Sequence, residues 1–252
     1  MRLVKSHEDP QKELSVNAQI PSATTLNLSD TLPLTCCRAG TCCHGKNVWL
    51  NPWEVARLAA SRGMPPRLFR DRNCEYGGIR LRFDGPASWK GMTSCSQYDP
   101  KRGCSVHEAR PLVCRLYPLG RQLRGGKIEY LYRGSVFPCL EGCPSVASLP
   151  HLTVADYLAG QDVENAQRAY DEYLELMQGL ADGAFALLLE TGLAASGDCH
   201  TLRLWRKAGS ENLREAVGRL GPEWVDLLMI PDVDAADDPV LFARRHHELL
   251  QT

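Results

Sequence analysis

Cysteines are the residues of this chain whose type and spacing most clearly permit chemistry. Ten of the eleven lie between Cys36 and Cys143, within less than half of the sequence. Free cysteines that serve only as small hydrophobic residues are usually scattered singly. The concentration therefore predicts a shared role, either in disulfide bonds or as ligands of a metal.

The cysteines form two dense signatures. The first reads Cys36-Cys37-Arg38-Ala39-Gly40-Thr41-Cys42-Cys43-His44-Gly45. The second has the spacing Cys95-x8-Cys104-x9-Cys114 and ends in Arg110-Pro111-Leu112-Val113-Cys114-Arg115-Leu116-Tyr117-Pro118. Two spacings, Cys37-x4-Cys42 and Cys139-x3-Cys143, approach the paired-cysteine knuckles of zinc sites. The spacings of radical-SAM enzymes and of bacterial ferredoxins are absent.

The redox compartment separates the two explanations. The first twenty residues are polar and mixed in charge, so we expect no secretory signal. Disulfides persist in oxidising compartments, whereas cytosolic thiols are kept reduced. An odd number of cysteines would also leave one thiol unpaired in a scheme made only of disulfides. We therefore favour metal binding in the cytoplasm, with disulfides and mixed redox chemistry as alternatives.

Composition excludes several classes of function. The chain has 252 residues, 44% of them hydrophobic, and a net charge of −1, so a real core can form. A nucleic-acid binder normally carries a basic stripe, and no apolar window is long enough to cross a bilayer. The motifs of phosphate loops, serine hydrolases and zinc proteases are absent. We expect neither a nucleic-acid nor a membrane partner.

Patterning predicts an α+β, helix-rich fold in three parts. Residues 1–31 resemble a polar lead-in, residues 32–150 form the cysteine-rich segment with small strands and irregular stretches, and residues 151–252 are helical. Asn51-Pro52-Trp53-Glu54 predicts a capped helix start, and Gly63 its end. The other expected helices cover 66–71, 111–117, 163–190, 202–208, 211–220, 222–228 and 239–250, and the strands 48–50, 79–83 and a hairpin over 123–131.

Four thiolates around Zn²⁺, or around an oxidised four-iron cluster, leave a net charge near −2. Arg38, Arg110 and Arg115 lie close enough in sequence to compensate it. If Cys114 lies in the first turns of a helix opened by Pro111, the helix dipole would favour its thiolate further.

Other residues in and beyond the signatures are further candidates. His44 is either a ligand or a loop histidine at the rim, and His107 belongs to a turn near the surface. Cys74 is either a ligand or a buried thiol. The run Arg244-Arg245-His246-His247 is expected to be a solvated helix face.

Both signatures carry a resemblance to a known family. The string Cys-Cys-His-Gly, then Val-x-Leu-x-Pro-x-Glu, then Cys-x8-Cys and Arg-Pro-x-x-Cys-Arg-x-x-Pro resembles the YkgJ-type cysteine-cluster proteins, also called CxxCxxCC proteins, whose domain chelates zinc or iron. The resemblance covers about residues 35–145. The family pattern C-x2-C-x2-C-C fits at Cys36, Cys42 and Cys43, but Ala39 occupies the middle position and Cys37 is extra.

The resemblance implies a metal site built from cysteines of both signatures: Cys36, Cys37, Cys42, Cys43, Cys95, Cys104 and Cys114, with Cys139 and Cys143 nearby. The cofactor would be an iron–sulfur cluster, with 4Fe-4S favoured, or zinc. The same family includes flagellin lysine N-methylases, which would make this a bacterial enzyme acting on a protein substrate. A zinc-stabilised interaction module and a metal carrier or redox sensor are the alternatives.

Overall fold

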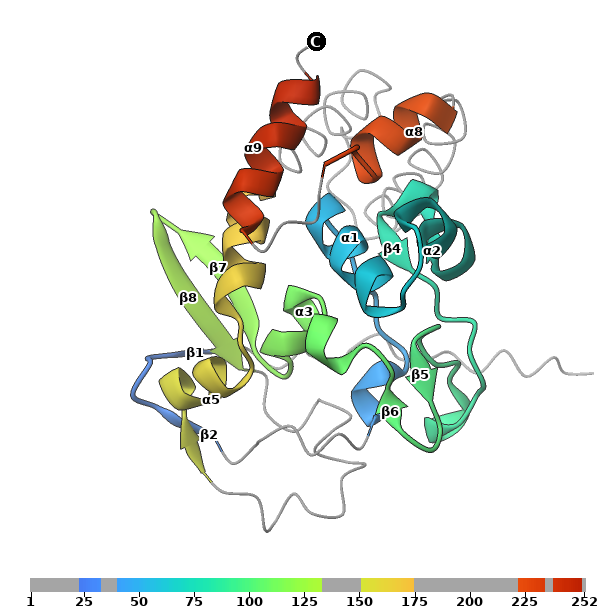
Figure 1. The fold of residues 1–252 in the computed structure, drawn as a ribbon. Helices are drawn as coiled ribbons and strands as arrows, with labels where there is room; N and C mark the ends of the chain where they lie inside the picture. Colours follow the sequence, from blue (N-terminus) through green and yellow to red (C-terminus); the bar gives the residue numbers. More distant parts are fainter. Residues whose placement is uncertain (1–22, 33–39, 133–150, 175–221, 234–237, 251–252) are drawn as a thin grey trace, which may run out of the picture.

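The computed structural model of the protein describes residues 23–32, 40–132, 151–174, 222–233 and 238–250. In this part of the chain, helices combine with small antiparallel sheets, which confirms the expected α+β class (Figure 1). No helix within these ranges is long and apolar enough to cross a membrane.

Helix α1 (Pro52–Ser61) begins as its sequence predicts. The Asn51 side chain accepts a hydrogen bond from the Glu54 backbone N–H at 2.9 Å, and the Glu54 carboxylate accepts one from the Asn51 N–H at 3.1 Å. Such a cap stabilises a helix by about 1 kcal/mol. The helix ends before Gly63, which has a φ of 59°. This confirms both predicted ends of the helix.

The segment after α1 folds back onto it. Helix α2 (Pro66–Asn73) leads into strand β3 (Cys74–Glu75), which pairs antiparallel with β4 (Arg80–Leu81). The predicted strand at 79–83 is therefore shorter than expected. The predicted strand at 48–50 reduces to one isolated bridge between Trp49 and Arg80, although Leu50 and Val48 still exchange backbone hydrogen bonds with this segment.

The largest described sheet has the strand order β1-β8-β7. Strands β7 (Gly120–Arg124) and β8 (Lys127–Tyr132) form the predicted hairpin, and Gly125 and Gly126 turn it with φ values of 55° and 76°. Positive φ at both positions suits a tight hairpin turn and is tolerated best by glycine.

Two strands lie in the stretch that the sequence suggested was only a polar lead-in. Strand β1 (Thr24–Leu26) pairs with β8, and β2 (Thr31–Leu32) pairs with β9 (Leu152–Thr153). Leu32 is 1% exposed. The stretch before residue 32 is thus joined by backbone pairing to segments more than a hundred residues away.

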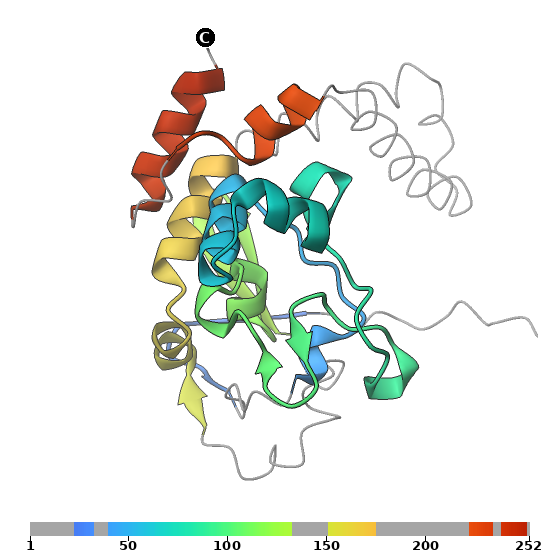
Figure 2. The ribbon, with the colours of Figure 1, turned by 45° about the vertical axis from the view of Figure 1, so that its right-hand side comes forward.

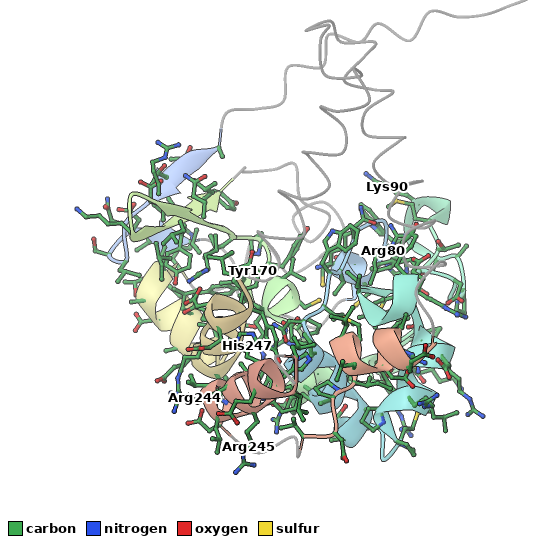
Figure 3. The ribbon with its side chains drawn as sticks, turned by 90° about the horizontal axis from the view of Figure 1, so that it is seen from above. Arg80, Lys90, Tyr170, Arg244, Arg245 and His247 are labelled. Atoms are coloured by element: carbon green, nitrogen blue, oxygen red, sulfur yellow. The ribbon has the colours of Figure 1, made fainter. Side chains whose placement is uncertain are left out.

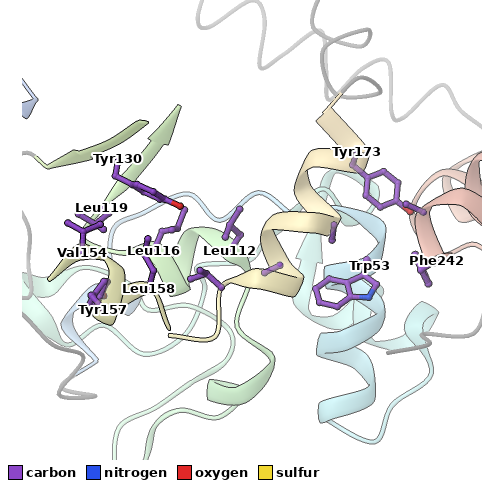
Figure 4. Close-up of a cluster of buried hydrophobic side chains, with 14 of the residues drawn as sticks. Trp53, Leu112, Leu116, Leu119, Tyr130, Val154, Tyr157, Leu158, Tyr173 and Phe242 are labelled. Atoms are coloured by element: carbon purple, nitrogen blue, oxygen red, sulfur yellow. The ribbon is translucent and has the colours of Figure 1, made fainter. Parts of the chain in front are cut away.

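Two hydrophobic clusters make up the core. The first joins α1, α3 (Leu112–Leu116), α5 (Val154–Gly160), helical residues 164–174 and α9 (Pro239–Leu250) (Figure 4). The second packs α1 against α2 and the neighbouring loops, and it contains Cys74 and Cys95. Helix α1 belongs to both, because Trp53 and Ala56 face the first cluster while Val55, Leu58 and Ala59 face the second.

The described C-terminal helices lie over the end of the molecule formed by α1 and α2 (Figures 1 and 2). Helix α8 (Pro222–Met229) is tied to α2 by ion pairs from Arg67 and Arg70 to Asp226. Helix α9 begins as predicted, with the Asp238 carboxylate accepting from the N–H groups of Val240 and Leu241. The predicted helices at 202–208 and 211–220, and the predicted helix beyond residue 174, lie outside the described residues.

The Arg244–His247 run is only partly the solvated face expected. Arg244 and Arg245 are exposed on α9 (Figure 3), but His246 is fully buried. Its Nδ1 faces the Tyr173 hydroxyl at 2.9 Å, and its Nε2 faces the Leu227 carbonyl at 2.8 Å. His246 therefore joins α9 to α8 and to residues 164–174.

Candidate metal centre

The first signature is described from Gly40 onward. Cys42 and Cys43 lie in a short 3₁₀ turn, η1 (Thr41–Cys43), which the Gly40 carbonyl closes by accepting from the Cys43 N–H at 2.8 Å. Gly40 has a φ of 75°, and a Cβ there would lie 2.4 Å from the Tyr98 ring. Glycine at this position therefore lets Tyr98 pack directly against the cysteine turn.

The second signature is bonded to the first through the backbone. The Cys95 N–H donates to the Cys43 carbonyl at 2.8 Å, and the Cys95 sulfur accepts from the Gln97 N–H at 3.5 Å. Cys104 lies opposite Tyr98 in the small hairpin of β5 (Tyr98–Asp99) and β6 (Gly103–Cys104). This hairpin lies beside η1 in both ribbon views (Figures 1 and 2).

Cys114 reaches the same place from α3. The helix begins after Pro111 and ends before Tyr117, as predicted, although it has only one and a half turns. Leu112 and Leu116 face the first hydrophobic cluster, whereas Cys114 packs against the second. The position of Cys114 on the helix therefore turns its thiol toward the other cysteines.

One small cavity brings these thiols together. It has a volume of about 50 Å³, whereas a single water needs about 10–15 Å³. A metal ion would fit in this space. Five thiols line it together with two basic side chains: Cys42, Cys43, Cys95, Cys104 and Cys114, with Lys46 and Arg110.

Three of the thiols interact directly. The Cys43 thiol interacts with the thiols of Cys42 and Cys104, which line the same cavity. The neighbouring Cys43 thiol lowers the pKa of Cys42 and that of Cys104, and the same interactions raise the pKa of Cys43 itself. The arrangement stabilises negative charge on the two outer sulfurs.

Burial has the opposite effect on the remaining thiols. It raises the pKa of Cys95 to about 11 and that of Cys114 to about 12. Burial therefore dominates the pKa of Cys114 in the metal-free protein, and the favourable effect of the α3 dipole on its thiolate stays a prediction. A metal would have to displace the protons of both thiols.

Charge compensation comes only in part from the residues that the sequence suggested. Arg110 lines the cavity and lowers the pKa of both Cys42 and Cys104. Arg115 instead donates to the backbone carbonyls of Glu108, Arg110 and Gln161, so it fastens the cysteine segment to the end of α5. Lys46, which sequence analysis missed, lines the cavity, and Arg38 lies outside the described residues.

The remaining candidates have distinct places. His44 is buried, not at the rim, with Nδ1 facing the Gly40 carbonyl at 3.1 Å and Nε2 facing the Ser88 hydroxyl at 2.6 Å. His107 lines the cavity, and its Nδ1 lies 3.1 Å from a Glu108 carboxylate oxygen. Cys74 is buried in the second cluster and does not line the cavity.

Four of the predicted ligands, Cys36, Cys37, Cys139 and Cys143, lie outside the residues that the structure describes. Within the described ranges, no three His, Cys, Asp or Glu side chains stand in a geometry ready to hold a metal ion. The five thiols therefore line one cavity without the spacing that a bound metal ion would require.

A comparison with protein families finds a similarity for this segment. Residues 35–131 match the family model CxxCxxCC, whose description is "Putative zinc- or iron-chelating domain". This segment is therefore similar to a CxxCxxCC domain. The match confirms the resemblance seen in the sequence, and it spans both signatures through Cys114 but ends before Cys139 and Cys143. No curated protein and no solved structure matches the chain.

Proposed function

We propose that the CxxCxxCC domain binds zinc or iron through cysteine thiolates. The observation that carries this proposal is the shared cavity, where thiols more than fifty residues apart in sequence lie together beside Lys46 and Arg110. The family description names the same two metals. Thiolate ligands suit both zinc and iron–sulfur clusters.

The proposed ligands come from the cavity and from the cysteines next to it in sequence. The cavity supplies Cys42, Cys43, Cys95, Cys104 and Cys114. Cys36 or Cys37, and Cys139 or Cys143, are further candidates from outside the described residues. An iron–sulfur cluster is our first choice, because the resemblance to flagellin lysine N-methylases points to one, and zinc is the alternative.

Metal analysis of protein purified without air tests the proposal. We expect iron with acid-labile sulfide and a brown colour, or zinc in a colourless protein, at a fixed ratio per chain. Either result supports the proposal and selects the metal. Protein that holds neither element, with its cysteines oxidised to one another, would overturn it.

Serine substitutions test which thiols bind. Cys104→Ser and Cys114→Ser each remove a cavity thiol, so we expect a severalfold loss of bound metal. Cys74→Ser is the matched control, because Cys74 is a buried thiol that lies away from the cavity. Equal metal content in all three variants would contradict the ligand assignment.

Catalysis on a protein substrate, which the methylase resemblance suggests, stays a prediction. Metal loading is its precondition, so the metal analysis comes first.

A further inference from the structure

Glu54 is a buried carboxylate outside the thiol cavity. It is 4% exposed, lies in the first turn of α1 and does not line the cavity. In the sequence it ends the motif Val48-x-Leu50-x-Pro52-x-Glu54, which follows the first cysteine signature. A polar group is costly to bury unless hydrogen bonds satisfy it. The partners of Glu54 therefore indicate what it does.

The two oxygens of Glu54 bind the starts of two different helices. Oε2 accepts from the Asn51 N–H at 3.1 Å, within the capping box of α1, and Oε1 accepts from the Leu112 N–H at 2.7 Å, at the first residue of α3. The N-cap residue of α3 is Pro111, whose side chain makes no capping hydrogen bond. Because the first N–H groups of a helix have no partners inside the helix, Glu54 supplies from α1 the cap that α3 lacks.

This cap lies close to a proposed metal ligand. Cys114 follows Leu112 by two residues on a helix of only five residues, so the start of α3 and the Cys114 thiol move together. Leu112 belongs to the first hydrophobic cluster, whereas Cys114 packs against the second and lines the cavity. A shift of α3 along α1 would break the Glu54–Leu112 hydrogen bond and displace the Cys114 thiol from the cavity.

Helix α1 is a fixed reference for this placement, because its residues belong to both hydrophobic clusters. The second cluster contains Cys95, and Cys43 and Cys104 pack against it. The two helices also lie side by side in both ribbon views (Figures 1 and 2). Glu54 therefore joins the helix that packs with these cysteines to the helix that carries Cys114. Metal sites need their ligands held to within about 0.5 Å.

We infer that Glu54 is a positioning residue of the metal centre, whose carboxylate caps α3 from α1 and thereby holds the Cys114 thiol in place beside the other thiols of the cavity. This inference rests on the proposed function, since it requires that Cys114 binds the metal. It gives the glutamate of the Val-x-Leu-x-Pro-x-Glu motif a role in metal binding without contact to the metal.

A metal titration of the reduced full-length chain tests the inference. Glu54→Gln keeps the shape of the side chain but offers one oxygen, in place of two, to the two backbone N–H groups. Asn51→Ala is the matched control, because it removes only the reciprocal bond from the Glu54 N–H and leaves both carboxylate bonds in place. Co²⁺ is the probe, because its thiolate bands report binding, and a competing chelator gives the dissociation constant.

Glu54→Gln should weaken Co²⁺ binding about 10-fold or more, the lower end of the usual loss when a group that orients a ligand is removed. Asn51→Ala should lower the denaturant midpoint of the metal-free protein, because it weakens the cap of α1, yet bind Co²⁺ within a few fold of wild type. Equal losses of affinity in the two variants would show that Glu54 acts only by stabilising α1, and would overturn the inference.

A double-mutant cycle assigns the effect to one thiol. In a Cys114→Ser background, Glu54→Gln should weaken Co²⁺ binding much less than in wild type, because the thiol that Glu54 positions is already gone. In a Cys95→Ser background, the full effect of Glu54→Gln should remain. An effect that is undiminished in Cys114→Ser would contradict the inference.

Two further outcomes separate the inference from the proposed function. Wild-type affinity in Glu54→Gln would overturn the inference and leave the proposed function intact, whereas wild-type protein without thiolate bands would overturn the proposed function. If Glu54→Gln does not fold without metal, Glu54→Asp replaces it, because a side chain shorter by one methylene cannot reach both N–H groups. Amide exchange at Leu112 should then be faster in Glu54→Asp than in Asn51→Ala, and equal rates would contradict the cap.

Discussion

Cys43 is the residue at which the two cysteine signatures meet. Its thiol interacts with the thiols of Cys42 and Cys104, and its carbonyl accepts a hydrogen bond from the Cys95 N–H. These contacts join residues of both signatures at one point. The sequence predicted that the signatures converge. It could not show that Arg115 donates to backbone carbonyls outside the cavity while Lys46 lines the cavity. The direction of a long side chain depends on its tertiary neighbours.

Gly40 should be intolerant of any side chain. Gly40→Ala combines a left-handed backbone, which costs about 1–2 kcal/mol, with a Cβ only 2.4 Å from the Tyr98 ring. We expect the free energy of unfolding to fall by more than 2 kcal/mol, roughly the backbone cost plus the steric one, and metal affinity to fall with it. Denaturant unfolding and Co²⁺ titration measure the two effects.

Gly63→Ala is the control, because Gly63 also has a positive φ but nothing lies within 4 Å of the position that a Cβ would take there. Gly63→Ala should lower the free energy of unfolding only by the backbone cost of about 1–2 kcal/mol, and it should leave metal affinity unchanged. Equal effects of the two substitutions would mean that contact with Tyr98 does not position the cysteine turn.

Glu54 should make stability depend on pH. Its carboxylate accepts from the N–H groups of Asn51 and Leu112, but burial dominates and raises its pKa from 4.5 to about 7. Between these values the folded protein holds a proton that the unfolded chain releases. The free energy of unfolding therefore falls as pH rises from 4.5 to 7, by about 3 kcal/mol for this group.

Glu54→Gln removes this titration and leaves one backbone N–H facing an amide NH₂, at a cost of about 1–3 kcal/mol. The free energy of unfolding of wild type should exceed that of the variant most at pH 4.5, and this difference should narrow toward pH 7.5. Comparing the two proteins isolates Glu54 from the titration of the thiols. A difference in the free energy of unfolding that stays constant across this range would contradict the claim that burial raises the pKa of Glu54.

Elements whose signals are local were predictable from the sequence. The capping box of α1, the Gly125-Gly126 turn and the Asp238-Pro239 start of α9 each depend on residues a few positions apart. Strand β1 was not predictable, because its two exposed threonines form a strand only by pairing with β8, more than a hundred residues later. The burial of His246 likewise depends on Tyr173 and Leu227.

The docking of α9 should weaken in acid. Burial lowers the pKa of His246, so as pH falls below the unfolded value of about 6.5 the unfolded chain takes up a proton that the folded protein resists. Stability contributed by His246 is therefore present above pH 6.5 and lost below it. Amide exchange in α9, corrected for intrinsic rates, should accelerate between pH 7.5 and 5.5.

His246→Leu should weaken α9 docking at neutral pH as well, because the Leu227 carbonyl loses its donor, and should reduce the pH dependence. His151→Leu, at an exposed histidine, should behave as wild type. Acceleration in α9 that is the same in His246→Leu as in wild type would assign the effect to another group.

At the scale of the whole molecule, the two hydrophobic clusters have different relations to the metal centre. Cys43, Cys95, Cys104 and Cys114 pack against the second cluster. The first contains Tyr157, Tyr173 and Phe242, together with α1 and α3 residues. A metal centre would therefore stabilise the second cluster directly and the first only through α1 and α3.

Metal removal should loosen the molecule unevenly. A structural metal can contribute on the order of 10 kcal/mol to a small module. Chelation should therefore lower the melting temperature and accelerate amide exchange in residues 40–110 more than in residues 164–174. Adding metal back under reducing conditions should reverse both changes. An unchanged melting temperature after complete metal removal would show that the centre is not structural.

The central claim is that cysteine thiolates bind zinc or iron. X-ray absorption spectroscopy of protein purified without air, at the absorption edge of the bound metal, tests this claim most directly because it reports the ligand atoms themselves. The account predicts a shell of sulfur atoms at about 2.3 Å, four for each metal ion, and its partial loss in Cys104→Ser but not in Cys74→Ser. A shell made only of oxygen and nitrogen atoms would contradict it.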